Sequence, residues 1–287
     1  MSTTHDAGST VEEHAAPVAA WDAIADGYDR YVAPQELELA TEALRLVGLE
    51  RGERFLDVAA GTGGLSLPAA RAGAHVLATD WSLAMVERFE ARARAEGLTN
   101  AEARVMDCHA LELDNDSFDV VASQFGVMLV PDQPRALREL VRVTKPGGRV
   151  LMIAYGPPNE IEFLHIFIAA LQAVVPEFPG LPDDPPPLEF QVSDREVLAR
   201  RLCDAGLEDV QITHSTERPV FASGEEMWNW VLYGNPIPGM LVGDLSDEQR
   251  AELRGVLHRM LSERAGSDGR TVVANRVNIA IGTKPAA

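Results

Sequence analysis

Short apolar runs alternate with segments of helical periodicity between Arg54 and Gly156, and this alternation constrains the fold more than any other feature. The apolar runs have the length and composition of β-strands, and several are apolar on both faces: RFLDVAA, AHVLATD, AEARVMD, FDVVASQFG and RVLMIAYG. Most are separated by helical segments of about ten to fifteen residues. The sequence therefore predicts an open, doubly wound α/β sheet, mostly parallel and Rossmann-like, with ligands bound beyond the carboxyl ends of its strands.

Helix boundaries follow from capping residues and helix breakers. One helical segment is expected to run from Trp21 to Val47, where apolar residues recur at three- and four-residue steps. Ser82 is placed to cap a helix that begins at Leu83. A further helix is expected to open at Pro134 and to close at Gly147.

The regular alternation of strands and helices ends after Gly156. This change defines the expected domain organisation. A disordered lead-in, residues 1–17, precedes a single domain over residues 18–287 whose core spans 48–156. A proline-rich insertion at 157–192 has the composition of a surface lid. Final strands are expected at 207–216 and 271–284, with a mainly helical insertion at 223–266 between them. The two insertions together predict a helical cap.

Charge and cysteine content exclude several classes of partner. The net charge of −19 repels phosphate backbones, so nucleic acid is not expected as a partner, whereas small neutral or cationic ligands are favoured. Two cysteines in 287 residues fit a reducing, cytoplasmic location. No apolar stretch reaches the roughly 18 to 20 residues that a membrane span requires. The sequence leaves the oligomeric state open.

A turn of small residues follows the first of these strands. Ala59, Gly61 and Gly63 would let a ligand approach the unpaired backbone amides where a helix begins. Asp80 ends the next strand, where a carboxylate can accept hydrogen bonds from both hydroxyls of a ribose. Simple tight packing would also explain the small residues. The added acid favours a nucleoside site.

A third acid lies at the same edge of the predicted sheet. Asp107 follows the third strand, where its carboxylate could accept from an exocyclic amine while the Cys108 amide donates to a ring nitrogen. Such a pair would recognise adenine. The alternative is that Asp107 caps a helix or is solvated in a loop.

The region from Ile24 to Tyr155 resembles the class I S-adenosylmethionine-dependent methyltransferases, particularly the branch that contains the quinone-biosynthesis C-methyltransferases. The motifs that carry the resemblance are WDAIADGYDRY, DVAAGTGG, DWSLAM, MDCHAL, FDVVASQFGVMLVPD and KPGGRVLM. Ala59 stands where the family has its first glycine. The resemblance implies S-adenosyl-L-methionine as the cofactor, held by Tyr28, Asp57, Ala59, Gly61, Thr62, Gly63, Asp80, Trp81, Met85, Asp107, Cys108 and Ser123.

The resemblance also implies the sheet's completion and the reaction. A strand near 210–213, with 272–281 antiparallel beside it, would complete a seven-stranded sheet. The expected activity is methyl transfer by in-line displacement at the sulfonium methyl. The acidic surface and the apolar cap segments predict a small, largely apolar metabolite as the acceptor. Whether carbon, oxygen or nitrogen receives the methyl stays open.

Candidate catalytic residues and alternative functions complete the interpretation. His165, Tyr155 and His109 lie near the predicted mouth of the site and are candidate general bases, although a structural role as a hydrogen-bonded or partly exposed side chain is favoured for each. No histidine or cysteine cluster has metal-ligand spacing, so no metal is expected. Two alternatives remain: an NAD(P)-dependent oxidoreductase, because Ala59, Gly61 and Gly64 also fit a degraded dinucleotide motif, and a non-catalytic S-adenosylmethionine-binding protein.

Overall fold

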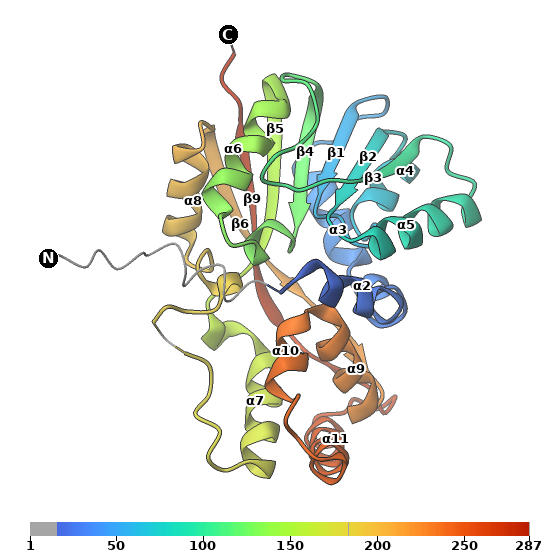
Figure 1. Ribbon diagram of the computed structural model, residues 1–287, viewed down its shortest axis with the longest axis vertical. Coiled ribbons are helices and arrows are strands. Elements are labelled where there is room, and N and C mark those ends of the chain that lie inside the picture. Colours follow the sequence, from blue (N-terminus) through green and yellow to red (C-terminus); the bar gives the residue numbers. More distant parts are fainter. Residues whose placement is uncertain (1–15, 183, 287) are drawn as a thin grey trace, which may run out of the picture.

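Seven strands form one sheet in the order β3-β2-β1-β4-β5-β9-β6 in the computed structural model, which describes residues 16–182 and 184–286 (Figure 1). The first five strands in this order run parallel, and β9 is antiparallel to both its neighbours. The doubly wound, mostly parallel seven-stranded sheet is therefore confirmed. The strands are β1 Arg54–Val58, β2 His75–Asp80, β3 Ala101–Val105, β4 Phe118–Gln124, β5 Thr144–Tyr155, β6 Glu208–Glu217 and β9 Asn275–Thr283.

Helices cover both faces of the sheet, as the alternation of strands and helices predicts. Helices α3, α4 and α5 pack on one face and α6 and α8 on the other. Their bounds are α3 Leu37–Leu46, α4 Ser66–Ala72, α5 Leu83–Ala95, α6 Gln133–Val143 and α8 Arg195–Asp204. Ser82 caps α5 as expected, because its hydroxyl accepts the Met85 amide at 3.1 Å. The central strands are apolar on both faces, and Val120 and Val121 of β4 are both fully buried.

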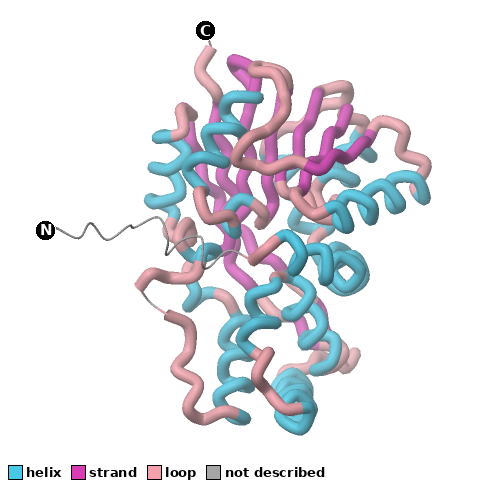
Figure 2. Tube along the Cα trace, viewed as in Figure 1, coloured by secondary structure: helices cyan, strands magenta, loops and turns pink. Residues whose placement is uncertain are grey.

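A separate helical body lies at the carboxyl end of the sheet (Figure 2). It contains α7, which follows β5, and α9 to α11, which lie between β7 and β8, and it has an apolar core of its own. The mainly helical cap is thus confirmed. Its elements are α7 Glu162–Val174, β7 Val220–Phe221, α9 Gly224–Gly234, α10 Pro236–Leu241, α11 Asp247–Ser262 and β8 Thr271–Val272.

Three expected boundaries are wrong. The segment from Trp21 to Val47 is divided into α2 (Val18–Gly27), a π-helical turn (Tyr28–Val32), a 3-10 turn (Ala33–Gln35) and α3, because Pro34 lacks the amide hydrogen that a continuous helix needs. Helix α6 ends at Val143 rather than Gly147, since Pro146 disfavours helical geometry in the residue before it. The final strand is divided into β8 and β9, and β8 pairs with β7 outside the main sheet.

Short 3-10 turns complete the connections, at Val127–Leu129, Pro158–Glu160 and Leu188–Phe190. Among the described residues, no helix is long and apolar enough to cross a membrane. The expected lead-in, residues 1–17, lies almost entirely outside the described part of the chain.

Candidate functional site

The turn after β1 brings backbone amides and the Asp80 carboxylate together. Ala59, Gly61 and Gly63 all have positive φ angles, of 54°, 55° and 93°. Asp80 ends β2, and its Oδ2 accepts the Gly61 amide at 2.8 Å while Oδ1 accepts the Ser82 amide at 2.9 Å. Burial raises the pKa of Asp80, although these amide hydrogen bonds oppose the shift. The carboxylate therefore fixes the turn at the sheet edge.

A cavity opens at this edge, and we call it the strand-end cavity. The last residues of β2 and β4 line it, together with the segments that follow β1, β2, β3 and β4 and one residue of α5. Eight of the twelve predicted cofactor residues line this cavity: Tyr28, Ala59, Gly61, Asp80, Trp81, Met85, Asp107 and Cys108. Two of the three predicted acids, Asp80 and Asp107, thus face one space.

Four other predicted cofactor residues do not line the strand-end cavity: Asp57, Thr62, Gly63 and Ser123. Asp57 is 1% exposed and lies beneath the turn, where its Oδ2 accepts the Ser66 hydroxyl at 2.5 Å. Its Oδ1 is buried without a hydrogen-bond partner among the described residues. Burial raises the pKa of Asp57 to about 7. The cofactor role of these four residues stays a prediction.

Asp107, Cys108 and His109 form a compact group at the opposite wall. His109 Nδ1 lies 2.7 Å from Asp107 Oδ1, and the buried Nε2 has no partner within the described chain. Burial alone would raise the pKa of Asp107, but hydrogen bonds from His109 lower it. Ligand atoms of all three residues lie within 4.8 Å of one another. Burial raises the pKa of the Cys108 thiol to about 12, so the protonated thiol is a poor metal ligand at neutral pH.

A second cavity lies under the helical cap, and we call it the cap cavity. It is mainly apolar and is lined from α7, α9 and α10 and from the segment that precedes α3. Tyr28, Phe125, Leu129 and Gly234 line both cavities. Phe125 stacks on Tyr155, with ring centroids 4.7 Å apart. The two spaces therefore share a wall of aromatic and apolar groups.

The three candidate catalytic residues are not brought together. Tyr155 lines the cap cavity, and its hydroxyl lies 3.3 Å from Glu217 Oε2. Burial raises the pKa of Tyr155 well above its ordinary value. His109 lines the strand-end cavity, whereas His165 is exposed on α7 and lines neither cavity. A catalytic role for each of them stays a prediction.

Sequence reasoning missed the carboxyls of the cap cavity. Glu36 and Glu217 are 4% and 2% exposed, and Glu189 also lines the cavity. No sequence signal identifies them, since Glu36 lies in an acidic stretch, PQELELATE, that reads as a solvated helix face. Trp228 and Trp230 are alternate residues of α9 and therefore point in different directions. Trp230 lines the cap cavity, whereas Trp228 packs against Phe167.

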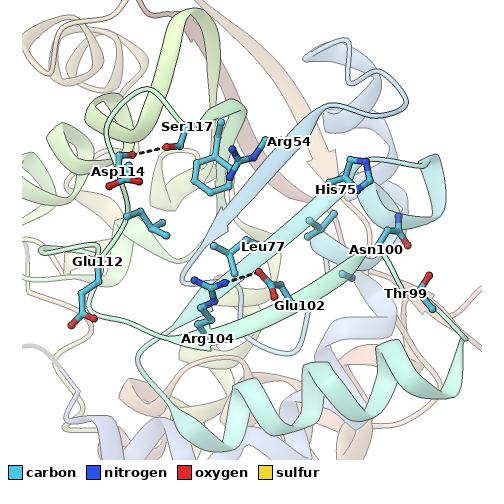
Figure 3. Close-up of a pocket in the computed structure, with 14 residues that line it drawn as sticks. Arg54, His75, Leu77, Thr99, Asn100, Glu102, Arg104, Glu112, Asp114 and Ser117 are labelled. Carbon is cyan, nitrogen blue, oxygen red and sulfur yellow. Dashed lines mark hydrogen bonds and ion pairs between the residues drawn. The ribbon is translucent and has the colours of Figure 1, made fainter.

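A third hollow lies at the other end of the sheet. Figure 3 shows this open groove, which runs across the amino-terminal parts of β1, β2 and β3. Two of its arginines have local partners. Arg104 pairs with Glu102 at 2.9 Å, and the Arg54 guanidinium lies 5.0 Å from the centroid of the Phe118 ring. The groove is remote from the carboxyl ends of the strands and carries no candidate site.

Comparison with known proteins identifies the family. Residues 55–148 match the family described as a methyltransferase domain. A demethylmenaquinone methyltransferase of Renibacterium salmoninarum is 33% identical over 171 residues, which cover 57% of this chain and 70% of that protein. The chain belongs to the class I S-adenosylmethionine-dependent methyltransferases.

Other relatives of this methyltransferase define the extent of the similarity. An uncharacterized protein of Mycobacterium bovis is 45% identical over 108 residues, which cover 38% of this chain and only 39% of that relative. The solved structure of the YcgJ protein from Bacillus subtilis covers 88% of this chain and 99% of its own, with a TM-score of 0.57 at 19% identity. That likeness shows the shared fold.

The strand-end cavity of the methyltransferase fits the family's cofactor. Asp80 and Asp107 face it from the ends of two neighbouring strands, at positions suited to a ribose and an adenine ring. The cavity also contains buried polar atoms that have no partner among the described residues, namely His109 Nε2 and the amide oxygen of Gln124. Unpaired buried polar atoms are costly, so a polar ligand would satisfy them.

Proposed function

We propose that the protein transfers a methyl group from S-adenosylmethionine to a small, largely apolar metabolite bound in the cap cavity. The observation that carries this proposal is the wall that the two cavities share at Tyr28, Phe125, Leu129 and Gly234. A cofactor on one side of this wall and an acceptor on the other would meet where the wall is open. The apolar lining of the cap cavity supports an apolar acceptor.

In this proposal the chain's own residues position the two reactants and exclude water. Asp80 and Asp107 would hold the adenosyl group, and Trp81 and Met85 would lie against it. Bound S-adenosylmethionine supplies an electrophilic methyl group on a sulfonium centre. The protein's main contribution is then alignment, since correct orientation removes much of the entropic barrier.

The insertion at 157–192 serves in this proposal as the lid of the acceptor site. It contributes α7 and the segment that contains Leu181, Pro187 and Phe190 to the lining of the cap cavity. Because these residues face the acceptor space and not the strand-end cavity, the lid would select the acceptor and leave cofactor binding to the sheet edge.

Calorimetric titration with S-adenosylhomocysteine and with NAD tests the proposal. We expect S-adenosylhomocysteine to bind and NAD not to bind, because the described lining of the strand-end cavity contains Asp80 and Asp107 but no lysine or arginine to balance the two phosphates of NAD. Binding of NAD without binding of S-adenosylhomocysteine would instead support the dinucleotide-dependent alternative. Binding of S-adenosylhomocysteine without methyl transfer to any acceptor would support a non-catalytic role.

A further inference from the structure

The cap cavity contains three carboxyl groups and no positively charged side chain. Glu36, Glu189 and Glu217 line it, and none of its described lining residues is a lysine, arginine or histidine. Acidic groups that line an apolar cavity are unusual, because the transfer of a carboxylate from water to an apolar site is costly unless a cation compensates it. The lining is therefore complementary to a ligand that brings a positive charge.

Among the described residues, the side chains that donate hydrogen bonds to Glu36 and Glu217 are neutral. Tyr28 donates to Glu36 Oε1 at 2.8 Å, and Asn275 and Tyr155 donate to Glu217 Oε2 at 2.9 and 3.3 Å. Both of these hydrogen bonds to Glu217 end on Oε2 and leave Oε1 for another donor. Burial raises the pKa of Glu217 to about 7, and nearby Glu36 adds to the shift.

The positive charge nearest to Glu36 is already paired. Arg92 acts on Glu36 electrostatically, but its guanidinium forms an ion pair with Asp29 at 3.3 Å and donates to the Thr62 carbonyl at 3.0 Å. Arg92 does not line the cap cavity. No positively charged side chain of the described cavity lining therefore pairs with Glu36 or Glu217.

Two further polar atoms at the cavity lack partners. Trp230 is 4% exposed, and its Nε1 is buried without an acceptor among the described residues. Glu189 Oε2 is likewise buried and unpaired. Since most buried polar atoms in folded proteins have hydrogen-bond partners, these atoms indicate a site that a ligand completes.

Aromatic rings form much of the remaining wall. Tyr155 and Trp230 both contact Phe163, at centroid distances of 5.7 and 5.0 Å, and all three line the cavity with Tyr28. Ring faces attract cations, and this attraction strengthens when water is excluded. Carboxyls that alternate with aromatic rings therefore favour an ammonium group on an apolar frame and disfavour an anion.

We propose that the methyl acceptor is a small apolar amine whose ammonium group binds between Glu36 and Glu217 in the cap cavity. This inference rests on the proposed function, because it specifies the substrate class of the same acceptor site. A bound ammonium would donate to Oε1 of Glu217 and would offset the charge of the buried pair. Because an ammonium nitrogen has no lone pair, the Glu217 carboxylate would first take one of its protons. The neutral nitrogen would then attack the sulfonium methyl as the methyl–sulfur bond breaks, which leaves S-adenosylhomocysteine and an N-methylammonium product. Acceptors that carry a carboxylate or phosphate are excluded by the same charges.

Matched ligands test the charge requirement. In the presence of saturating S-adenosylhomocysteine, phenethylamine, phenethyl alcohol and phenylacetate are titrated by calorimetry, followed by tryptamine, tryptophol and indoleacetate. Within each series the apolar frame is constant and only the polar group changes. We expect an amine to bind about ten- to hundredfold more tightly than its alcohol, with no binding of the acid. Affinity for the amine should fall as pH is lowered through about 7, when Glu217 takes up a proton.

A matched pair of variants tests whether the preference for an amine depends on a carboxyl of the cap cavity or on a surface carboxyl. Glu217→Gln should abolish the preference for amine over alcohol, whereas Glu38→Gln, on the exposed side of α3, should leave it unchanged. Both variants should bind S-adenosylhomocysteine as the wild type does, which verifies that they are folded. If the wild type binds S-adenosylhomocysteine but no amine exceeds its alcohol, the amine inference is overturned. If S-adenosylhomocysteine itself fails to bind, the proposed function fails first.

Discussion

The Asp80 carboxylate accepts a 2.8 Å hydrogen bond from the Gly61 backbone amide and so joins the end of β2 to the turn after β1. Its second oxygen accepts the Ser82 amide at the start of α5. One side chain thus fixes the turn, starts the next helix and still lines the strand-end cavity. A substitution at Asp80 should affect both the shape of the turn and the ligand.

Asp80→Ala should weaken S-adenosylhomocysteine binding about ten- to hundredfold, because hydrogen bonds to a charged group contribute about 1.5 to 3 kcal/mol. The protein should remain folded, with a free energy of unfolding lower by about 1 kcal/mol from the lost amide contacts. Calorimetry and urea unfolding measure the two effects. Asp114→Ala, on an exposed loop, serves as the control. An unchanged affinity for Asp80→Ala would refute the assignment of Asp80 to the cofactor.

Ala59→Gly should stabilise the protein by up to about 1 kcal/mol. Ala59 has a φ of 54°, in the left-handed region, where a Cβ atom costs about 1 to 2 kcal/mol and the greater unfolded-state entropy of glycine cancels part of the gain. Ala60→Gly is the matched control, because Ala60 has no positive φ and its replacement should destabilise. Urea unfolding that ranked the two variants in the opposite order would contradict the role of backbone strain here.

Asp57→Asn should cost less stability at about pH 8 than at about pH 5. Burial raises the pKa of Asp57 from 3.8 to about 7, so the folded protein binds a proton in this interval that the unfolded chain does not. The stability that this proton confers is complete below the ordinary carboxyl pKa and is lost as pH rises through about 7. Asparagine stays neutral throughout. Urea unfolding at both pH values measures the difference, and an equal cost at both would show that Asp57 ionises normally.

Gly27→Ala should destabilise the protein by about 1 to 3 kcal/mol. A Cβ atom at Gly27 would lie 2.1 Å from the Tyr233 ring, which stacks on Tyr31 at a centroid distance of 5.6 Å. Gly239→Ala is the control, because nothing lies within 4 Å of its added Cβ and alanine favours the helix. Thermal unfolding compares the two, and a neutral Gly27→Ala would show that the ring moves aside freely.

Replacement of residues 176–187 by a Gly/Ser segment of equal length should impair the cap cavity and spare the cofactor. Leu181 and Pro187 line the cap cavity and do not line the strand-end cavity. We therefore expect unchanged S-adenosylhomocysteine affinity and at least about tenfold weaker binding of the tightest probe amine. Equal losses for both ligands would show that the segment supports the whole domain and is not a lid.

The sheet was predictable because its signals are local. Apolar runs such as that containing Val120 and Val121 mark strands buried on both faces, and Ser82 marks the start of α5 through its own capping bond. The boundaries that failed have local causes of a different kind. Pro34 and Pro146 interrupt helices at positions where the spacing of apolar residues predicts that the helix continues. The spacing of apolar residues gives no information about the backbone restrictions that a proline imposes.

The candidate site was predictable in part. Asp80 and Asp107 could be assigned to one cavity because the carboxyl ends of neighbouring parallel strands meet at one edge of the sheet. Asp57 lies in β1, just before the turn, yet the structure places its carboxyl beneath the turn and against Ser66. Which way a side chain points at a strand end depends on the packing of the following helix, and this packing is not encoded in the spacing of the motif.

The sequence by itself determined the order of the strands and helices, the turn of small residues and the acids that follow two of the strands, because each depends on neighbours along the chain. Only the tertiary structure decided that Glu36 and Glu217 share the cap cavity, and that Tyr28 and Phe125 form the wall between the two spaces. The physical reason is burial. A carboxylate attracts a cation strongly only when segments that are distant in the sequence bury it away from water. No local sequence pattern encodes this burial.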